Sequence, residues 1–177
     1  MKEIEDFMSK INETDVNWKN ISIGVDKYLS IMNDLPEVDI SSTKGESFRK
    51  RYSNFYRMNR RSIEFKTSYF KIFENFKITN TEDFGSALDK IAETTNRIEA
   101  SFSSKMIASL NANKPLWDSI ILKNLEIKLP KYGSYERAVK IKLIYKELES
   151  NYQRFLKTKS AKNWLNLFDK KIGKFNI

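Results

Sequence analysis

Lys105 and Asp118 are the residues of this chain whose types and spacing could support covalent or acid–base chemistry. The 177 residues include no His and no Cys, which removes the commonest general base, the usual zinc ligands and the Ser-His and Cys-His nucleophile pairs. Any catalysis therefore rests on Asp, Glu, Lys, Tyr or Ser. Lys105 is expected near the start of one helix, and Asp118 opens the helix that follows the loop at Pro115.

The segment 97–125 reads RIEASFSSKMIASLNANKPLWDSIILKNL and resembles the centre of the helix-hairpin-helix DNA glycosylase superfamily. In that family a hairpin with the pattern Gly-hydrophobic-Gly-x-Lys precedes a proline-containing loop and an Asp at a helix start. The stretch PLWDSII, which begins at Pro115, is similar to the second part. The stretch SFSSK, which ends at Lys105, stands where the hairpin would stand. The order of the helices is similar over about residues 48–125.

The resemblance implies a nucleic-acid-binding domain that excises bases, as a hydrolase or a lyase. Asp118 would stabilise an oxocarbenium-like sugar or activate water, and the amine of Lys105 could instead form a Schiff base with the sugar. The target base would be flipped out of the helix, and Trp117 could line its pocket. Ser103 and Ser104 would lie beside the DNA phosphates, although Ser101 and Ser103 replace the glycines that let backbone amides approach a phosphate.

Two further departures from the family pattern concern spacing and composition. Asp118 follows Lys105 by 13 residues, which is shorter than the family's usual spacing. The absence of Cys excludes the iron–sulfur branch.

Each of these residues also has a purely structural interpretation. Asp118 is a good helix N-cap, which is worth about 1 kcal/mol without any catalysis. Lys105 is one of many lysines on a basic chain, and Trp117 could equally be a core anchor. Base excision and simple helix capping therefore both remain open for Asp118 at this point.

The net charge of +9 is concentrated in two blocks. Residues 44–77 carry 10 basic and 3 acidic residues, a net charge of +7, and residues 119–177 have a net charge of +9. Such blocks suit a polyanion, because binding releases condensed counterions; the alternative is a lysine-rich solvated surface. Closely spaced arginines favour phosphate contacts. The residues predicted to bind nucleic acid are Lys50, Arg57, Asn59, Arg60, Arg61, Ser103, Ser104 and Trp117.

The sequence predicts an all-α fold, a compact bundle of about seven to nine helices. Five Gly and three Pro leave few forced turns, and apolar residues recur with the helical period. We expect a single helical domain, 1–177, with 1–40 as an acidic N-terminal helical leader and 44–177 as the main body. Helices are expected near 3–13, 21–34, 47–76 (with a break near 61–67), 81–98, 104–111, from Asp118 or Ser119, 134–157, and from Ser160 to Gly173. The expected N-caps of the helices near 81–98, 134–157 and 160–173 are Thr81, Ser134 and Ser160.

These features lead to one expected function and two alternatives. DNA is the expected partner, with RNA as the alternative, and Asp118 is expected at the mouth of a pocket between 47–62 and 100–125, with Trp117 or Lys105. We expect no cofactor, no metal site and no membrane partner, since no apolar run approaches the ~20 residues of a membrane span, and a cytoplasmic location. The alternatives are a non-catalytic helical interaction or regulatory protein, of phage or mobile-element type, and a homo-oligomer formed through the 23 aromatic residues.

Overall fold

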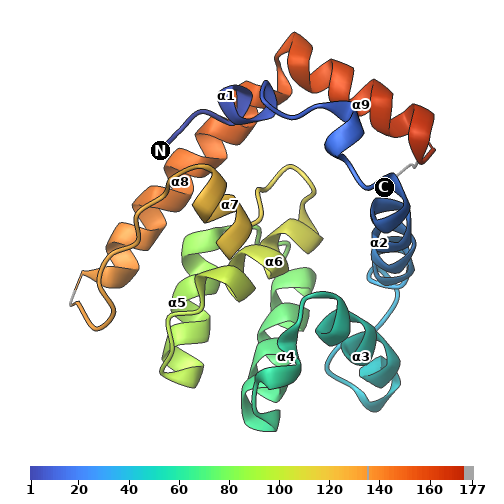
Figure 1. The fold of residues 1–177 in the computed structure, drawn as a ribbon. Helices are drawn as coiled ribbons and strands as arrows, with labels where there is room; N and C mark the ends of the chain where they lie inside the picture. The colour runs from blue at the N-terminus through green and yellow to red at the C-terminus, as the bar shows by residue number, and fades with distance from the viewer. Residues whose placement is uncertain (135, 174–177) are drawn as a thin grey trace. The chain divides into compact units, whose positions relative to one another are not determined.

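The computed structural model describes residues 1–134 and 136–173, and within these ranges the chain is helical with no β-strand (Figure 1). The prediction of an all-α fold with about seven to nine helices is confirmed. In these two ranges three 3-10 turns accompany the helices: η1 (Glu13–Asp15), η2 (Thr43–Gly45) and η3 (Met58–Arg60). The α-helices in the described ranges are α1 (Ile4–Met8), α2 (Trp18–Met32), α3 (Glu46–Phe55), α4 (Ile63–Ile78), α5 (Phe84–Thr95), α6 (Ala100–Leu110), α7 (Ser119–Asn124), α8 (Arg137–Leu156) and α9 (Lys159–Lys171).

The chain forms two compact units. Unit 1 comprises Met1–Ile23 and Asn113–Ile177, and unit 2 comprises Gly24–Ala112, so that α2 begins in unit 1 and ends in unit 2. In unit 1, α1 packs against α8 and α9. The boundaries differ from the expected border between leader and main body near residue 40, and the single domain over 1–177 stays a prediction.

Most helix starts lie within a few residues of the expected positions, but three N-caps are corrected. Asp83 caps α5 by accepting from the backbone N–H of Ser86, where Thr81 was expected. Thr158 caps α9, where Ser160 was expected. Helix α8 begins after Glu136, which makes no side-chain cap hydrogen bond, where Ser134 was expected. At the starts of α5 and α9, more than one Ser, Thr or Asp residue can accept such a bond, so the sequence does not choose among them.

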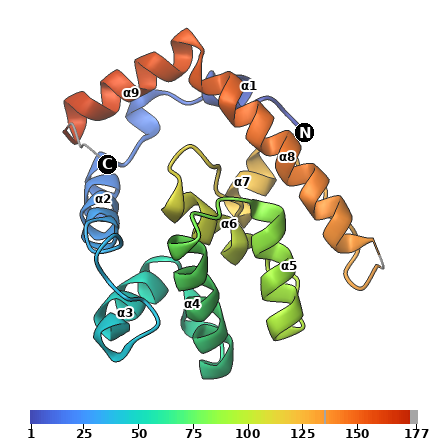
Figure 2. The same cartoon turned by 180° about the vertical axis from the view of Figure 1, so that it is seen from behind.

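The core of unit 2 is aromatic and lies between α3, α4, α5 and α6. Helix α4 lies beside α5, and α5 beside α6, in both views (Figures 1 and 2). Tyr52 of α3 packs edge-on against Phe70 of α4, with ring centroids 5.7 Å apart. This packing accounts for the many aromatic residues of this half of the chain, and oligomerisation through them stays a prediction. The buried aromatic residues of the cluster are Phe48, Tyr52, Tyr56, Phe65, Tyr69, Phe70, Phe73, Phe76 and Phe102.

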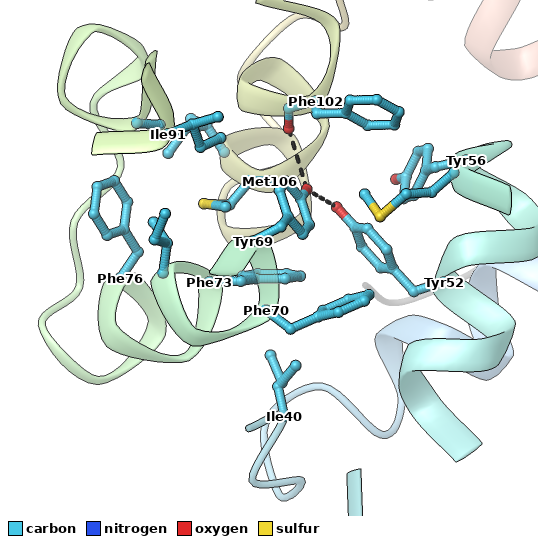
Figure 3. Close-up of a cluster of buried hydrophobic side chains, with 14 of the residues drawn as sticks. Ile40, Tyr52, Tyr56, Tyr69, Phe70, Phe73, Phe76, Ile91, Phe102 and Met106 are labelled. Atoms are coloured by element: carbon cyan, nitrogen blue, oxygen red, sulfur yellow. Dashed lines mark hydrogen bonds between the residues drawn. The ribbon is translucent and has the colours of Figure 1, made fainter. Parts of the chain in front are cut away.

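A chain of hydrogen bonds crosses this core (Figure 3). The hydroxyl of Tyr69 donates to the carbonyl oxygen of Phe102 at 3.1 Å, so the hydroxyl of Tyr52, 2.8 Å away, must donate to Tyr69. Both hydroxyls are fully buried, and burial raises their pKa above the ordinary value of 10. Their hydrogen bonds offset the cost of burying polar groups, and they connect α3, α4 and α6.

The loop before α3 is held by charged side chains from α3 and α4. The buried carboxylate of Glu74 accepts from the backbone N–H of Ile40 at 2.7 Å and pairs with Lys77 at 3.1 Å. Arg49 donates to the carbonyl oxygens of Ile40 and Ser42, each at 2.6 Å. The loop is therefore fixed against the helices, although its sequence resembles a flexible connection.

Candidate nucleic-acid interface

The expected long helix over 47–76 is interrupted between α3 and α4. Tyr56 ends α3, and Arg57 takes a left-handed conformation with φ 55° and ψ 41°. Ser62 then starts α4 by accepting from the backbone N–H of Phe65 at 3.2 Å. The break thus occupies residues 56–62 and lies slightly before the expected position of 61–67. It places the arginines and Asn59 in a turn and not along a helix face.

Two adjoining hollows lie along α3, η3 and α4, and we call them together the α3–α4 groove. The larger has a volume of about 410 Å³ and the smaller about 400 Å³. Asn54 and Asn59 line both hollows, and Asn59 donates a side-chain hydrogen bond to Asn54 at 3.0 Å. The remaining residues that line the groove are Glu46, Arg49, Lys50, Ser53, Ile63, Lys66, Thr67 and Phe70 in the larger hollow and Arg57 and Arg60 in the smaller.

The groove brings together four of the residues predicted to bind nucleic acid. Lys50, Arg57, Asn59 and Arg60 all line it, and all four are exposed. Sequence reasoning missed the groove residues Asn54, Arg49 and Lys66. Lys66 had a usable signal, because it interrupts the otherwise apolar stripe expected on this helix. Asn54 had no such signal, since a single Asn on the surface of a helix is common and indicates no function.

The positive charge of the groove is largely uncompensated. In the described part of the chain no ion pair involves Lys50, Arg57, Arg60 or Lys66, and among the described lining residues Glu46 alone is acidic. Arg49 also faces the groove, but its guanidinium holds the loop before α3. Like charges gathered in a concave surface raise the local potential and attract polyanions.

Arg61 is placed differently from its neighbours. Its guanidinium pairs with Glu99 at 2.7 Å and lies 5.6 and 5.2 Å from the ring centroids of Phe65 and Phe102. Burial raises the pKa of the Glu99 carboxyl, while the charges of Arg61 and Arg97 lower it. Arg61 lines neither hollow and instead connects η3 with the start of α6. Its predicted role on nucleic acid therefore receives no support from its position.

The stretch SFSSK lies inside α6 and forms no hairpin turn. Ser103 and Ser104 have no exposed surface and donate to the carbonyl oxygens of Glu99 and Ser101. Serine, unlike glycine, has no particular preference for a left-handed turn, so the helix continues through these positions. In this conformation neither hydroxyl is accessible to a nucleic acid. Lys105 donates to the carbonyl oxygen of Tyr56 at 3.5 Å, and its amine lies 5.2 Å from the ring centroid of Phe102.

Asp118 and Trp117 belong to unit 1, whereas Lys105 and residues 47–62 belong to unit 2. Asp118 caps α7, because one carboxylate oxygen accepts from the backbone N–H groups of Ile120 and Ile121, each at 2.9 Å. Trp117 is buried, and its ring lies 6.4 Å from that of Tyr145. The expected helix start at Asp118 is confirmed. Its catalytic role, and the pocket shared with Lys105 or Trp117, stay predictions.

The variant Asp118→Asn separates capping from catalysis. Asn caps a helix almost as well as Asp, so we expect thermal stability and nucleic-acid affinity close to those of the unchanged protein. Base release from uracil-containing and alkylated DNA should be measured for both proteins. Base release by the unchanged protein that disappears in the variant would support the catalytic role, and no release by either protein would contradict it.

Comparisons with known proteins do not assign the chain to a family. No protein-family model matches it, and neither a curated protein nor a solved structure was found to be similar. Among the described residues, no helix is both long and apolar enough to cross a membrane. The chemistry of the α3–α4 groove is therefore the most direct guide to function.

Proposed function

We propose that this protein binds nucleic acid through the α3–α4 groove. The observation that carries the proposal is the convergence of Lys50, Arg57, Arg60 and Lys66 on one groove, without an ion pair in the described residues. Arginine guanidinium groups match the geometry of phosphate oxygens, and lysines act as point charges beside them. Such a surface fits the regularly spaced phosphates of a nucleic-acid backbone.

The C-terminal basic block offers a weaker surface, although its net charge is larger. Several of its cations are already paired: Arg154 with Glu3 at 2.8 Å, and Lys140 with Glu136 at 2.8 Å. Lys171 pairs likewise with a glutamate of the N-terminal segment. The acidic N-terminal residues thus neutralise part of this block within unit 1. This contrast favours the α3–α4 groove as the polyanion site.

The proposal predicts binding that weakens steeply with salt. If four cations each neutralise one phosphate, log K should fall against log salt with a slope of about −3, at roughly 0.7 to 0.9 for each contact. Fluorescence anisotropy of labelled single-stranded and duplex DNA, titrated with the protein between low and moderate salt, measures this slope. No binding at low salt would contradict the proposal. Base excision at Asp118 is a separate proposal, and nucleic-acid binding does not depend on it.

A further inference from the structure

Ile63 is an exposed apolar side chain among the basic residues of the groove. It is the first residue of α4, it lines the larger hollow together with Asn59 and Lys66, and 77% of its surface is exposed. The sequence pattern places Ile63 on the apolar face of a continuous helix, but the break at residues 56–62 leaves its side chain exposed. An aliphatic side chain in this position gives the groove a surface that charges cannot provide, namely one that packs against the face of a base.

The amides of Asn54 and Asn59 lie at the junction of the two hollows. Their mutual hydrogen bond uses one N–H of Asn59 and the oxygen of Asn54. In the described residues, the side-chain oxygen and the second side-chain N–H of Asn59 make no other hydrogen bond. An Asn side chain that presents one acceptor and one donor matches the N6 amino group and N7 of adenine.

The cations lie on both sides of these two features. Arg57 and Arg60 line the smaller hollow, while Lys50 and Lys66 line the larger one, and Asn59 belongs to both. A strand that passes from one hollow to the other would carry a phosphate at each end and a base in the middle. Each hollow has a volume of about 400 Å³, which is the size of a small-molecule site and is enough for one nucleotide.

We propose that the α3–α4 groove takes single-stranded nucleic acid and holds one unstacked base, with adenine preferred, against Ile63 and the amide of Asn59. This inference rests on the proposed function and adds the class of ligand. In a duplex the base faces are stacked and covered, so that Ile63 could contact a base only after unstacking. In a single strand the faces are accessible, and binding through stacking platforms and a charged groove is typical of such ligands.

Single-residue variants with matched controls test the inference. Ile63→Ala removes the apolar contact; its control is Ile78→Ala on the same helix, because Ile78 is 70% exposed and lies outside the groove. Asn59→Ala removes the amide, and Asn75→Ala is its control, because Asn75 is an exposed residue of α4 outside the groove. The probes are labelled oligomers of about ten nucleotides: oligo-dA, oligo-dT, oligo-rA and the dA·dT duplex.

We expect single strands to bind more tightly than the duplex. Ile63→Ala should weaken the binding of oligo-dA about fivefold, as expected for losing roughly 1 kcal/mol of apolar contact, and should leave duplex binding unchanged. Asn59→Ala should abolish the preference for oligo-dA over oligo-dT. Both control variants should bind like the unchanged protein, and comparison of oligo-dA with oligo-rA shows which sugar the groove accepts.

Two results would overturn the inference, and they are distinguishable. Equal affinity for duplex and single strands, with Ile63→Ala and Asn59→Ala no different from their controls, would reject the base contact and leave nucleic-acid binding by the groove intact. Failure of the unchanged protein to bind any of the four probes at low salt would reject the proposed function together with the inference. Circular dichroism spectra identical to those of the unchanged protein ensure that a loss of affinity does not reflect unfolding.

Discussion

Reversal of charge at Arg57 and Arg60 together should lower the affinity for nucleic acid about 100-fold or more at low salt. Each arginine lines the smaller hollow and is exposed. A hydrogen bond to a charged group contributes about 1.5 to 3 kcal/mol, and each 1.4 kcal/mol corresponds to a tenfold change in affinity. Anisotropy titrations of Arg57→Glu/Arg60→Glu with the same labelled DNA measure the loss.

The matched control carries the same change of net charge elsewhere on unit 2. Lys27 and Lys71 are exposed and line neither hollow, so Lys27→Glu/Lys71→Glu should retain affinity within a few-fold. Equal losses in both double variants would mean that net charge alone governs binding, which would contradict a localised site.

Arg57→Gly adds a test in which stability and binding change in opposite directions. Arg57 holds a left-handed conformation just after α3, where glycine is the preferred residue and a side chain costs roughly 1 kcal/mol. The glycine variant should therefore be more stable by about that amount and yet bind nucleic acid more weakly. An affinity equal to that of the unchanged protein would remove Arg57 from the interface.

The largest effect on stability is expected at Gly45. A methyl group there would lie 2.8 Å from the carbonyl oxygen of Ile40 and closer still to that of Asp39, both of them backbone atoms of the loop before α3. Because overpacking forces backbone shifts, Gly45→Ala should lower the free energy of unfolding by about 2 to 3 kcal/mol. Urea denaturation followed by circular dichroism, with an unchanged denaturant slope, gives the difference.

Gly24 provides the control for this substitution. It lies inside α2, and a methyl group there would meet nothing within 4 Å. Gly24→Ala should therefore stabilise the protein by up to about 1 kcal/mol, because alanine is the better helix former. If the Gly45→Ala variant were as stable as the Gly24→Ala variant, this result would contradict the close packing of the loop against the start of α3.

The sequence predicted the helical class because apolar residues recur with one period along most of the chain. It could not locate the break between α3 and α4 accurately. The aromatic residues before and after the break continue the same apolar helix face. The left-handed conformation of Arg57 cannot be recognised from the residue type, because arginine has no preference for it. Ser62 was a usable signal, since a serine before a helix turn is a common N-cap.

Part of the candidate site was also predictable from the sequence. Lys50, Arg57 and Arg60 could be assigned to a basic surface from their charge alone. Burying an unpaired charge is costly, so lysine and arginine side chains usually lie at the surface. Arg61 lies outside the groove because it pairs with Glu99, which is 38 residues away in the sequence. No local sequence pattern reveals such a distant partner. Ser103 and Ser104 were assigned from a motif, and burial in α6 is a property of packing that the motif does not contain.

Mapping the nucleic-acid contacts residue by residue tests the central claim most directly. Backbone amide chemical shifts of the isotope-labelled protein should be recorded while a single-stranded oligonucleotide is added at low salt. We predict that the largest shifts fall on Asn54, Arg57, Asn59, Arg60 and Ile63, the residues at and around the junction of the two hollows. Shifts confined to α8 and α9, or no shifts at all, would contradict binding by the α3–α4 groove.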